Sequence, residues 1–286
     1  MITPTIAPPR PLERSPAFQA PPGAWDCHCH VFGPNDEFPY AEERSYTPHD
    51  VSAERLLQLH DALGFERAVL VQPAAHGTDH RAMLDALDRS GGLYRGVMLV
   101  DNDGQDLDVA TLHTRGIRAV RYNFLPHLGA PPDMGVVKAL VERITSQGWH
   151  LCLHTQPRQF GMLTQWLDLG VPVVLDHIGR PQLHDPETPA ALDMLRRLLD
   201  HPALFLKLSG IDRMMEGGGT LAEALSTVRN LFETAPHKCL WGTDFPHPNH
   251  THIPDDADLV DLIPRMVPES LSQNMLLVEN PNRLYC

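Results

Sequence analysis

The stretch WDCHCHVF, residues 25–32, places two histidines two positions apart in a short apolar run. The run predicts a β-strand, and side chains at alternate positions of a strand share one face. We therefore expect Asp26, His28 and His30 to point one way and the two cysteines between them to point the other way. The two imidazoles then lie at the carboxyl end of the first strand.

Seven further apolar, β-branched runs follow and alternate with segments of helical periodicity. They are AVLVQPA at 68–74, GVMLVD at 96–101, GIRAVRYNF at 116–124, HLCLHTQ at 150–156, VPVVLDHIG at 171–179, LFLKLSG at 204–210 and CLWGTDFP at 239–246. Apolar strands separated by helices indicate parallel pairing with both faces covered. Eight such units predict an α/β fold, a single (β/α)8 TIM-type barrel. An open doubly wound sheet is the alternative, but no Gly-rich phosphate turn follows the first strand.

The chain divides into a short arm and one large domain. Residues 1–24 are rich in proline and show little periodicity, which predicts a Pro-rich N-terminal arm. The barrel is expected to span 25–286. Its clearest helix covers residues 52–64, where three leucines fall on one face between a serine that can cap the start and a glycine that can end it.

Composition narrows the class of partner. The net charge is -13 and no Lys/Arg cluster occurs, which argues against binding of nucleic acid or of an anionic membrane surface. No apolar run approaches the roughly 18 residues of a membrane span, and the N-terminus lacks the apolar stretch of a signal peptide. We expect a cytoplasmic protein, monomer or homodimer, that acts on a small molecule.

The five cysteines form no CxxC pair, so we expect buried thiols and no disulfide framework.

Polar side chains recur at the carboxyl ends of the predicted strands. Besides the first-strand histidines they are Gln72, His76, Arg121, Asn123, His154, Asp176, His177, Ser209, Arg213, Asp244 and His247. In a barrel these positions converge on one mouth, where active sites are built. A single buried histidine is more often satisfied by a backbone carbonyl. Burying several imidazoles and a carboxylate together costs desolvation that a metal or a substrate would offset.

These residues suggest a catalytic metal. His28 and His30, with a third imidazole from His154 or His177 and the carboxylate of Asp244, offer the N and O ligands of a divalent metal with a position open for water. A bare imidazole cluster could also polarise a carbonyl. Asp244 could ligate the metal, take a proton from water as general base, or only cap a helix.

Two arginines suggest an anionic substrate. Arg121 and Arg213 stand at the predicted mouth and suit bidentate contact with a carboxylate or a sulfonate. The alternative is an ion pair within the protein, to Asp26, Asp176 or Asp212.

Five motifs together carry a family resemblance: PPGAWDCHCHVFGP, HGTD, RYNFL, LDHIGRP and WGTDFPHPN. From about residue 21 to the C-terminus the chain resembles the amidohydrolase superfamily, most closely its 2-pyrone-4,6-dicarboxylate hydrolase-like lactonases, with 4-sulfomuconolactone hydrolases nearby. The resemblance implies that Asp244 activates a water for attack on a lactone carbonyl while His28, His30 and His177 polarise that carbonyl. It also implies that Tyr46, His76, Arg121 and Arg213 surround the substrate, and we add Asn123 to this set.

Two departures from that branch bear on substrate and metal. Where its members carry a second arginine after the fourth strand, this chain has Pro126 and His127, so His127 is a candidate substrate contact and one carboxylate clamp is lost. Where they carry a tyrosine on the fifth strand, this chain has His154. The branch resembles a metal-free variant of the superfamily, and an imidazole at this place is the usual third ligand of metal-dependent members. We expect one divalent metal, zinc as first candidate, held by His28, His30, His154 and Asp244.

The favoured function is hydrolysis of a small anionic lactone from aromatic-compound degradation. Within enzymes, the alternatives are a sugar-acid lactonase or lactone isomerase and a metal-dependent decarboxylase of the same superfamily. Outside enzymes, the alternative is a non-catalytic anion-binding protein. Asp244 beside the histidines favours turnover, because a base at a polarised carbonyl adds nothing to anion affinity.

Overall fold

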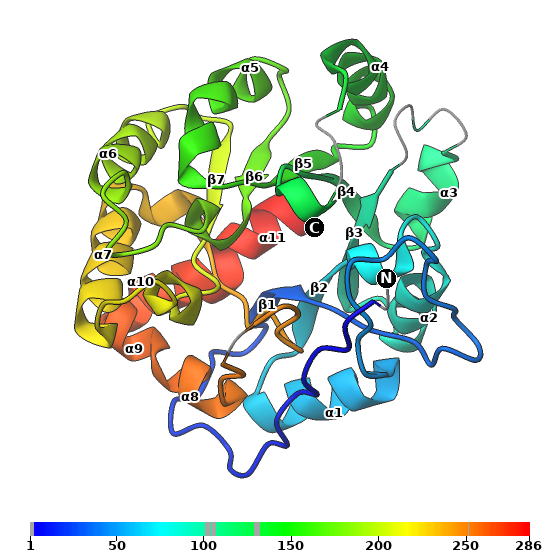
Figure 1. The fold of residues 1–286 in the computed structure, drawn as a ribbon, viewed down its shortest axis with the longest axis horizontal. Helices are drawn as coiled ribbons and strands as arrows, with labels where there is room; N and C mark the ends of the chain where they lie inside the picture. Colours follow the sequence, from blue (N-terminus) through cyan, green and yellow to red (C-terminus); the bar gives the residue numbers. More distant parts are fainter. Residues whose placement is uncertain (1–2, 101–103, 105–106, 129–131, 251) are drawn as a thin grey trace.

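The computed structural model describes residues 3–100, 104, 107–128, 132–250 and 252–286. Within this part of the chain, eight parallel strands pair in sequence order and helices alternate with them (Figure 1). The strands are β1 Trp25–Cys29, β2 Arg67–Val71, β3 Tyr94–Leu99, β4 Ile117–Asn123, β5 His150–His154, β6 Val173–Leu175, β7 Leu204–Lys207 and β8 Cys239–Leu240.

The sheet closes between β1 and the segment that follows the short strand β8. Cys27 N donates to Trp241 O at 2.8 Å, and Asp244 N donates to His28 O at the same distance. His30 N donates to Phe245 O, also at 2.8 Å. The predicted (β/α)8 barrel is therefore confirmed.

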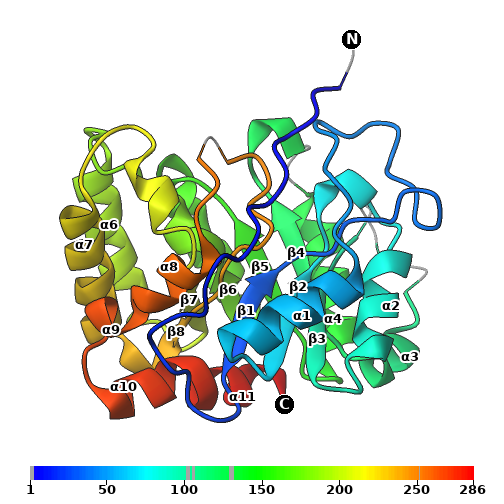
Figure 2. The same cartoon turned by 90° about the horizontal axis from the view of Figure 1, so that it is seen from below.

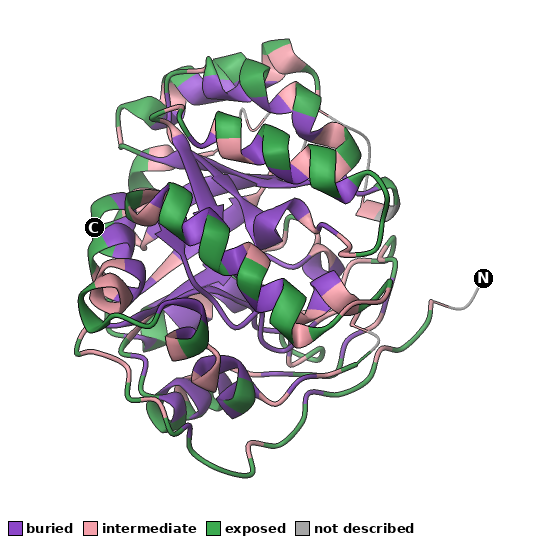
Figure 3. Cartoon of the chain, turned by 90° about the vertical axis from the view of Figure 1, so that its left-hand side faces the viewer, coloured by how far each residue is buried: buried purple, intermediate pink, exposed green. Residues whose placement is uncertain are grey.

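Helices surround the barrel with their apolar faces inward (Figures 2 and 3). The α-helices of the described residues are α1 Ala53–Leu63, α2 Arg81–Arg89, α3 Val109–Thr114, α4 Met134–Thr145, α5 Leu163–Leu167, α6 Thr188–Leu198, α7 Leu221–Thr234, α8 Asp256–Asp261, α9 Ile263–Met266, α10 Ser270–Asn274 and α11 Asn280–Tyr285. The expected helix after β1 is confirmed as α1. The Ser52 side chain accepts from Arg55 N, and Gly64 ends the helix at φ 85°, a conformation that glycine adopts without strain. Among the described residues, no helix is long and apolar enough to cross a membrane.

Small and β-branched side chains fill the barrel interior. The interior cluster takes Cys27, Val69, Val97, Ala119, Cys152, Val174 and Leu240 from seven strands. Tyr285 of α11 joins it, and its ring stacks on Trp25 with centroids 5.7 Å apart. The last helix therefore closes the end of the barrel opposite the predicted mouth. Cys27, Cys29, Cys152 and Cys239 are free and buried, as expected.

Strand β1 departs from regular alternation. Its pairing with β2 shifts register between Asp26 and Cys29. Cys27 lies in the barrel interior, whereas Asp26 faces His60 of α1 on the outer side, with 3.2 Å between the Asp26 Oδ2 and His60 Nε2 atoms. The expectation that Asp26 shares a face with the two histidines is therefore wrong, because a bulge adds one residue and reverses the alternation.

The N-terminal arm lies extended along the barrel. Thr5 forms a parallel bridge with Thr47, and Phe18 N donates to the Asp261 carboxylate at 2.8 Å. Arg14 pairs with Asp258 and Asp261 at the start and end of α8. The division of the chain at residue 24 stays a prediction.

A buried ion pair joins the carboxyl ends of the neighbouring strands β6 and β7. The Lys207 ammonium lies 3.1 Å from Asp176 Oδ1, and both side chains are fully buried. Burial would lower the pKa of Lys207, but the facing Asp176 carboxylate raises it above its ordinary value. The charged amine is thus held on the barrel axis just below the mouth.

Lys207→Met should destabilise the protein by about 3–5 kcal/mol, because it leaves the Asp176 charge buried with one partner fewer. The free energy of unfolding, measured in urea, checks this. Adding Asp176→Asn to the same chain should recover only part of the loss, because it removes the unpaired carboxylate but also the ion-pair partner of buried Arg121. A change of less than about 1 kcal/mol in the single variant would contradict the assigned role.

Candidate active site

The predicted catalytic residues meet at the carboxyl ends of the strands. An inner cavity of 50 Å³ lies among them. Its wall includes His30, Tyr46, Arg121, His154, His177, Arg180, Arg213 and Asp244. These residues come from β4 and β5 and from the loops after β1, β6, β7 and β8.

Asp244 is the centre of the site. Its Oδ1 faces three imidazoles, at 3.4 Å from His30 Nε2, 3.7 Å from His28 Nε2 and 3.8 Å from His177 Nε2. Its Oδ2 accepts two hydrogen bonds from Arg213, at 2.8 and 3.1 Å. Burial would raise the pKa of this carboxyl, but His177 and Arg213 lower it well below its usual range. Asp244 is therefore ionised and fixed, with one oxygen turned toward the imidazoles.

His28 of β1 and His30, the residue that follows this strand, both turn Nε2 toward Asp244. His30 Nδ1 lies 2.7 Å from Val71 O, and since a carbonyl only accepts, Nδ1 carries the proton. His28 Nδ1 lies 3.2 Å from the Lys207 ammonium and 3.4 Å from Asp176 Oδ1. Its Nε2 is buried and has no hydrogen-bond partner among the described residues.

His28, His30 and Asp244 form a candidate metal group. Each offers one ligand atom, and the three atoms lie within 4.8 Å of one another. Two imidazole nitrogens and a carboxylate oxygen suit a divalent metal such as zinc. The residues therefore fit the metal that the sequence suggests.

His154 does not join this group. Its Nδ1 lies 3.2 Å from Asn123 Oδ1, and its Nε2 lies 3.4 Å from the Arg180 guanidinium. A cation beside Nε2 opposes a second cation on the same nitrogen. The role of His154 as a fourth metal ligand stays a prediction.

His177 lies in a left-handed turn at the end of β6. His177 and Ile178 have φ of 52° and 59°, and a Cβ on the following Gly179 would lie 2.3 Å from the Phe160 ring. The turn directs His177 Nε2 toward Asp244 and Nδ1 toward Ser209 Oγ, 2.9 Å away. Burial lowers the pKa of His177 to about 3, so the ring is neutral near pH 7. When the Ser209 hydroxyl donates to Nδ1, the ring proton is on Nε2 and points into the site.

The two predicted arginines are paired within the protein. Arg121 Nε donates to Asp176 Oδ2 at 2.8 Å, which is one of the ion pairs considered from the sequence. Arg213 is held by Asp244 and by the backbone oxygens of the loop after β8. Neither guanidinium is fully available to a substrate.

Arg180 is a candidate site residue that the strand-end argument missed. It has φ 55° and lines the inner cavity, and its guanidinium has no carboxylate partner among the described residues. It stands in the motif LDHIGRP, but it follows the left-handed turn rather than the strand. Only the turn geometry returns its side chain to the mouth.

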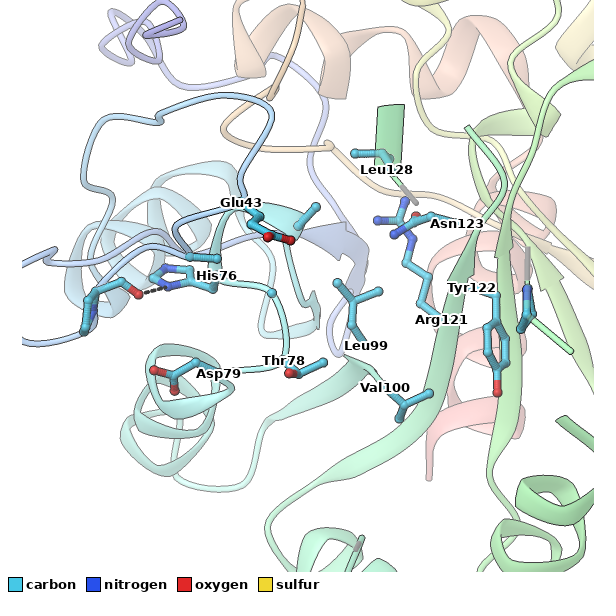
Figure 4. Close-up of a pocket in the computed structure, with 15 residues that line it drawn as sticks. Glu43, His76, Thr78, Asp79, Leu99, Val100, Arg121, Tyr122, Asn123 and Leu128 are labelled. Atoms are coloured by element: carbon cyan, nitrogen blue, oxygen red, sulfur yellow. Dashed lines mark hydrogen bonds between the residues drawn. The ribbon is translucent and has the colours of Figure 1, made fainter. Parts of the chain in front are cut away.

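The remaining predicted contacts are spread more widely. Buried Tyr46 lines the inner cavity, whereas His76 and Asn123 line a larger neighbouring cavity of 670 Å³ (Figure 4). Both ring nitrogens of His76 form hydrogen bonds with the loop after β1: Nε2 accepts from Gly33 N, and Nδ1 donates to Pro39 O. The side chain of His127 lies outside the described residues.

Asp26 supports the site from the outer side of β1. Its Oδ1 accepts from His28 N and Thr243 N, each at 3.0 Å, and its Oδ2 accepts from Thr243 Oγ1 at 2.5 Å. His60 and, beyond it, Tyr94 complete the chain, with 2.6 Å between His60 Nδ1 and the Tyr94 hydroxyl. One carboxylate thus joins the two segments that carry the metal group.

Comparisons with known proteins agree with this geometry. Residues 25–286 match the family described as Amidohydrolase, and the chain belongs to that family. It is 40% identical over 283 residues to the 2-pyrone-4,6-dicarboxylate hydrolase of Comamonas testosteroni, covering 94% of this chain and 92% of that protein. It is 34% identical to the 4-sulfomuconolactone hydrolase of Rhizobium radiobacter, covering 97% and 94%. A crystal structure from Agrobacterium tumefaciens, 24% identical, has the same fold with a TM-score of 0.80, covering 94% and 98%.

Asp26→Asn should lower kcat roughly 10- to 100-fold and leave KM nearly unchanged. The single amide oxygen cannot replace both carboxylate oxygens, and the NH2 group cannot accept, so one of the hydrogen bonds that join the His28 and Asp244 segments is lost. Steady-state kinetics on a lactone substrate checks this. Tyr94→Phe is the matched control. It removes only the hydroxyl at the far end of the hydrogen-bond chain from Asp26 through His60, and it should retain most of the activity. Equal losses in the two variants would indicate a general stability effect instead.

Proposed function

We propose that the protein is a lactonase that hydrolyses a small anionic lactone from the degradation of aromatic compounds. The observation that carries this proposal is the ionised Asp244, with one oxygen free of arginine contacts, beside the neutral imidazole of His177. The relatives named as 2-pyrone-4,6-dicarboxylate hydrolase and 4-sulfomuconolactone hydrolase support the choice of a lactone.

The reaction assigns separate roles to four side chains. Arg180 binds the acidic group of the substrate, because its guanidinium is not paired with a carboxylate of the protein. His177 donates a hydrogen bond from its Nε2–H to the lactone carbonyl oxygen as negative charge develops there, and it keeps the proton. Asp244 Oδ1 takes a proton from the attacking water, and Arg213 keeps the other oxygen in place. Cleavage of the ring C–O bond gives a carboxylate and an enol or alcohol, which takes up the proton.

We propose one divalent metal at His28, His30 and Asp244, with zinc as the first candidate and His154 as a possible addition by sequence. The lowered pKa of Asp244 supports this proposal. A carboxylate of low pKa accepts a proton readily only from a water that is itself made more acidic. A bound metal supplies that acidity and polarises the carbonyl.

Asp244→Asn should lower kcat roughly 100- to 10,000-fold, because the amide cannot accept the proton of the attacking water. Binding of the lactone, measured by calorimetry, should persist. Asp258→Asn on α8 is the matched control and should leave kcat unchanged. Hydrolysis at the normal rate in Asp244→Asn would exclude the assigned base, and binding without any turnover in the unaltered protein would favour an anion-binding protein.

Arg180→Met should raise KM for an anionic lactone roughly 10- to 100-fold, because a charge-assisted hydrogen bond to the acidic group is lost. Kinetics with an anionic lactone and its neutral methyl ester checks this, and the ester should show little change. Arg180→Lys retains the charge, so its KM for the anionic lactone should lie between that of the unaltered protein and that of Arg180→Met. An equal effect on both substrates would mean that Arg180 acts on the fold of the site rather than on the anion.

Freshly purified protein should contain about one equivalent of a divalent metal by elemental analysis, and chelation should abolish hydrolysis. His30→Asn should lose the metal. His154→Tyr tests the predicted fourth ligand, and retention of metal in that variant would remove His154 from the ligand set. Full activity in metal-free protein would contradict the metal proposal and leave the proposed hydrolysis standing.

A further inference from the structure

Two cavities adjoin at the mouth of the barrel and differ in size. The inner cavity around Asp244 measures 50 Å³, and the outer chamber beside it measures 670 Å³. Ala74, Arg121 and Leu128 line both. The inner cavity holds little more than the reacting ester and one small acidic group, so the rest of a substrate bound there has to extend past Arg121 into the outer chamber.

The two cavities also differ in charge. Three arginines and one carboxylate line the inner cavity. The outer chamber has Glu43 and Asp79 against Arg121 alone, and Arg121 already pairs with Asp176. Asp79 pairs with Arg81, but Glu43 has no cationic partner among the described residues. An anionic group is therefore favoured in the inner cavity and disfavoured in the outer chamber.

The remaining wall of the outer chamber is made of apolar residues and of neutral polar residues such as Thr78 and Asn123. Figure 4 shows Leu99 and Val100, at the end of β3, facing the space between His76 and Arg121. Leu128, Pro39 and Pro132 extend the apolar wall. Burial lowers the pKa of His76, so this imidazole adds no positive charge near pH 7.

We propose that the substrate is a lactone with a single acidic group and, away from it, a neutral apolar substituent such as a short alkyl or aryl group that occupies the outer chamber. This inference rests on the proposed lactonase activity and refines its substrate class. A second carboxylate, as in the dicarboxylate substrate named for one relative, would face Glu43, and the described residues of the chamber offer it no free cation. An apolar substituent instead gains from leaving water for the wall of Leu99 and Val100.

A substrate series tests this directly. The probes are 2-pyrone-6-carboxylates with hydrogen, ethyl, butyl or phenyl at ring carbon 4, together with 2-pyrone-4,6-dicarboxylate. We expect kcat/KM to rise up to about fourfold per added methylene and to exceed the value for the dicarboxylate. A flat series, or preference for the dicarboxylate, would overturn the inference and leave the lactonase activity intact. Hydrolysis of none of the five would overturn both.

A filled chamber provides the second test. Leu99→Trp should raise KM for the butyl compound roughly tenfold and leave the hydrogen compound within about twofold. Val100→Trp, on the loop after β3, repeats the test if Leu99→Trp does not fold. Leu271→Trp, at a position with 82% exposure and outside the chamber, is the control and should change neither value. Equal losses for the butyl and hydrogen compounds in both chamber variants would overturn the inference.

Discussion

One buried carboxylate sets the geometry on which the site depends. Asp176 lies at the end of β6 and is contacted by Arg121 of β4, Lys207 of β7 and His28 of β1. A fully buried charge is tolerated only when its charged partners are in place. The ion pairs of Asp176 therefore fix the register of these strands relative to one another. That register aims His28 at Asp244 and leaves Arg121 between the two cavities.

The fold was largely predictable from the sequence, because strand and helix periodicities alternate over nearly the whole chain. Each of the eight predicted strand segments overlaps an observed strand, although β6 and β8 are much shorter than predicted, and Ser52 and Gly64 bound α1 as expected. The failure at Asp26 has a local cause. Alternation assumes regular pairing, and the register shift in β1 depends on the neighbouring strand, which no pattern within the first strand reveals.

Site residues that lie at the ends of strands could be predicted from the sequence, whereas those that lie in turns were harder to predict. His28, His30 and Asp244 come together as expected. Arg180 was missed because the four left-handed residues 177–180, of which it is the last, return its side chain to the mouth. The pairing of Arg121 and Arg213 with carboxylates could be considered from the sequence but not decided, since it depends on distances between separate strands.

The contact between Asp26 and Thr243 joins residues 217 positions apart. Contacts of such sequence separation form late, because the entropy of closing a long loop is lost before the contact stabilises anything. His28 and Asp244 flank this contact, so the catalytic group does not exist until the two ends of the sheet have met. Recovery of activity during refolding therefore reports the last long-range step, and it should follow rather than accompany the recovery of helical structure.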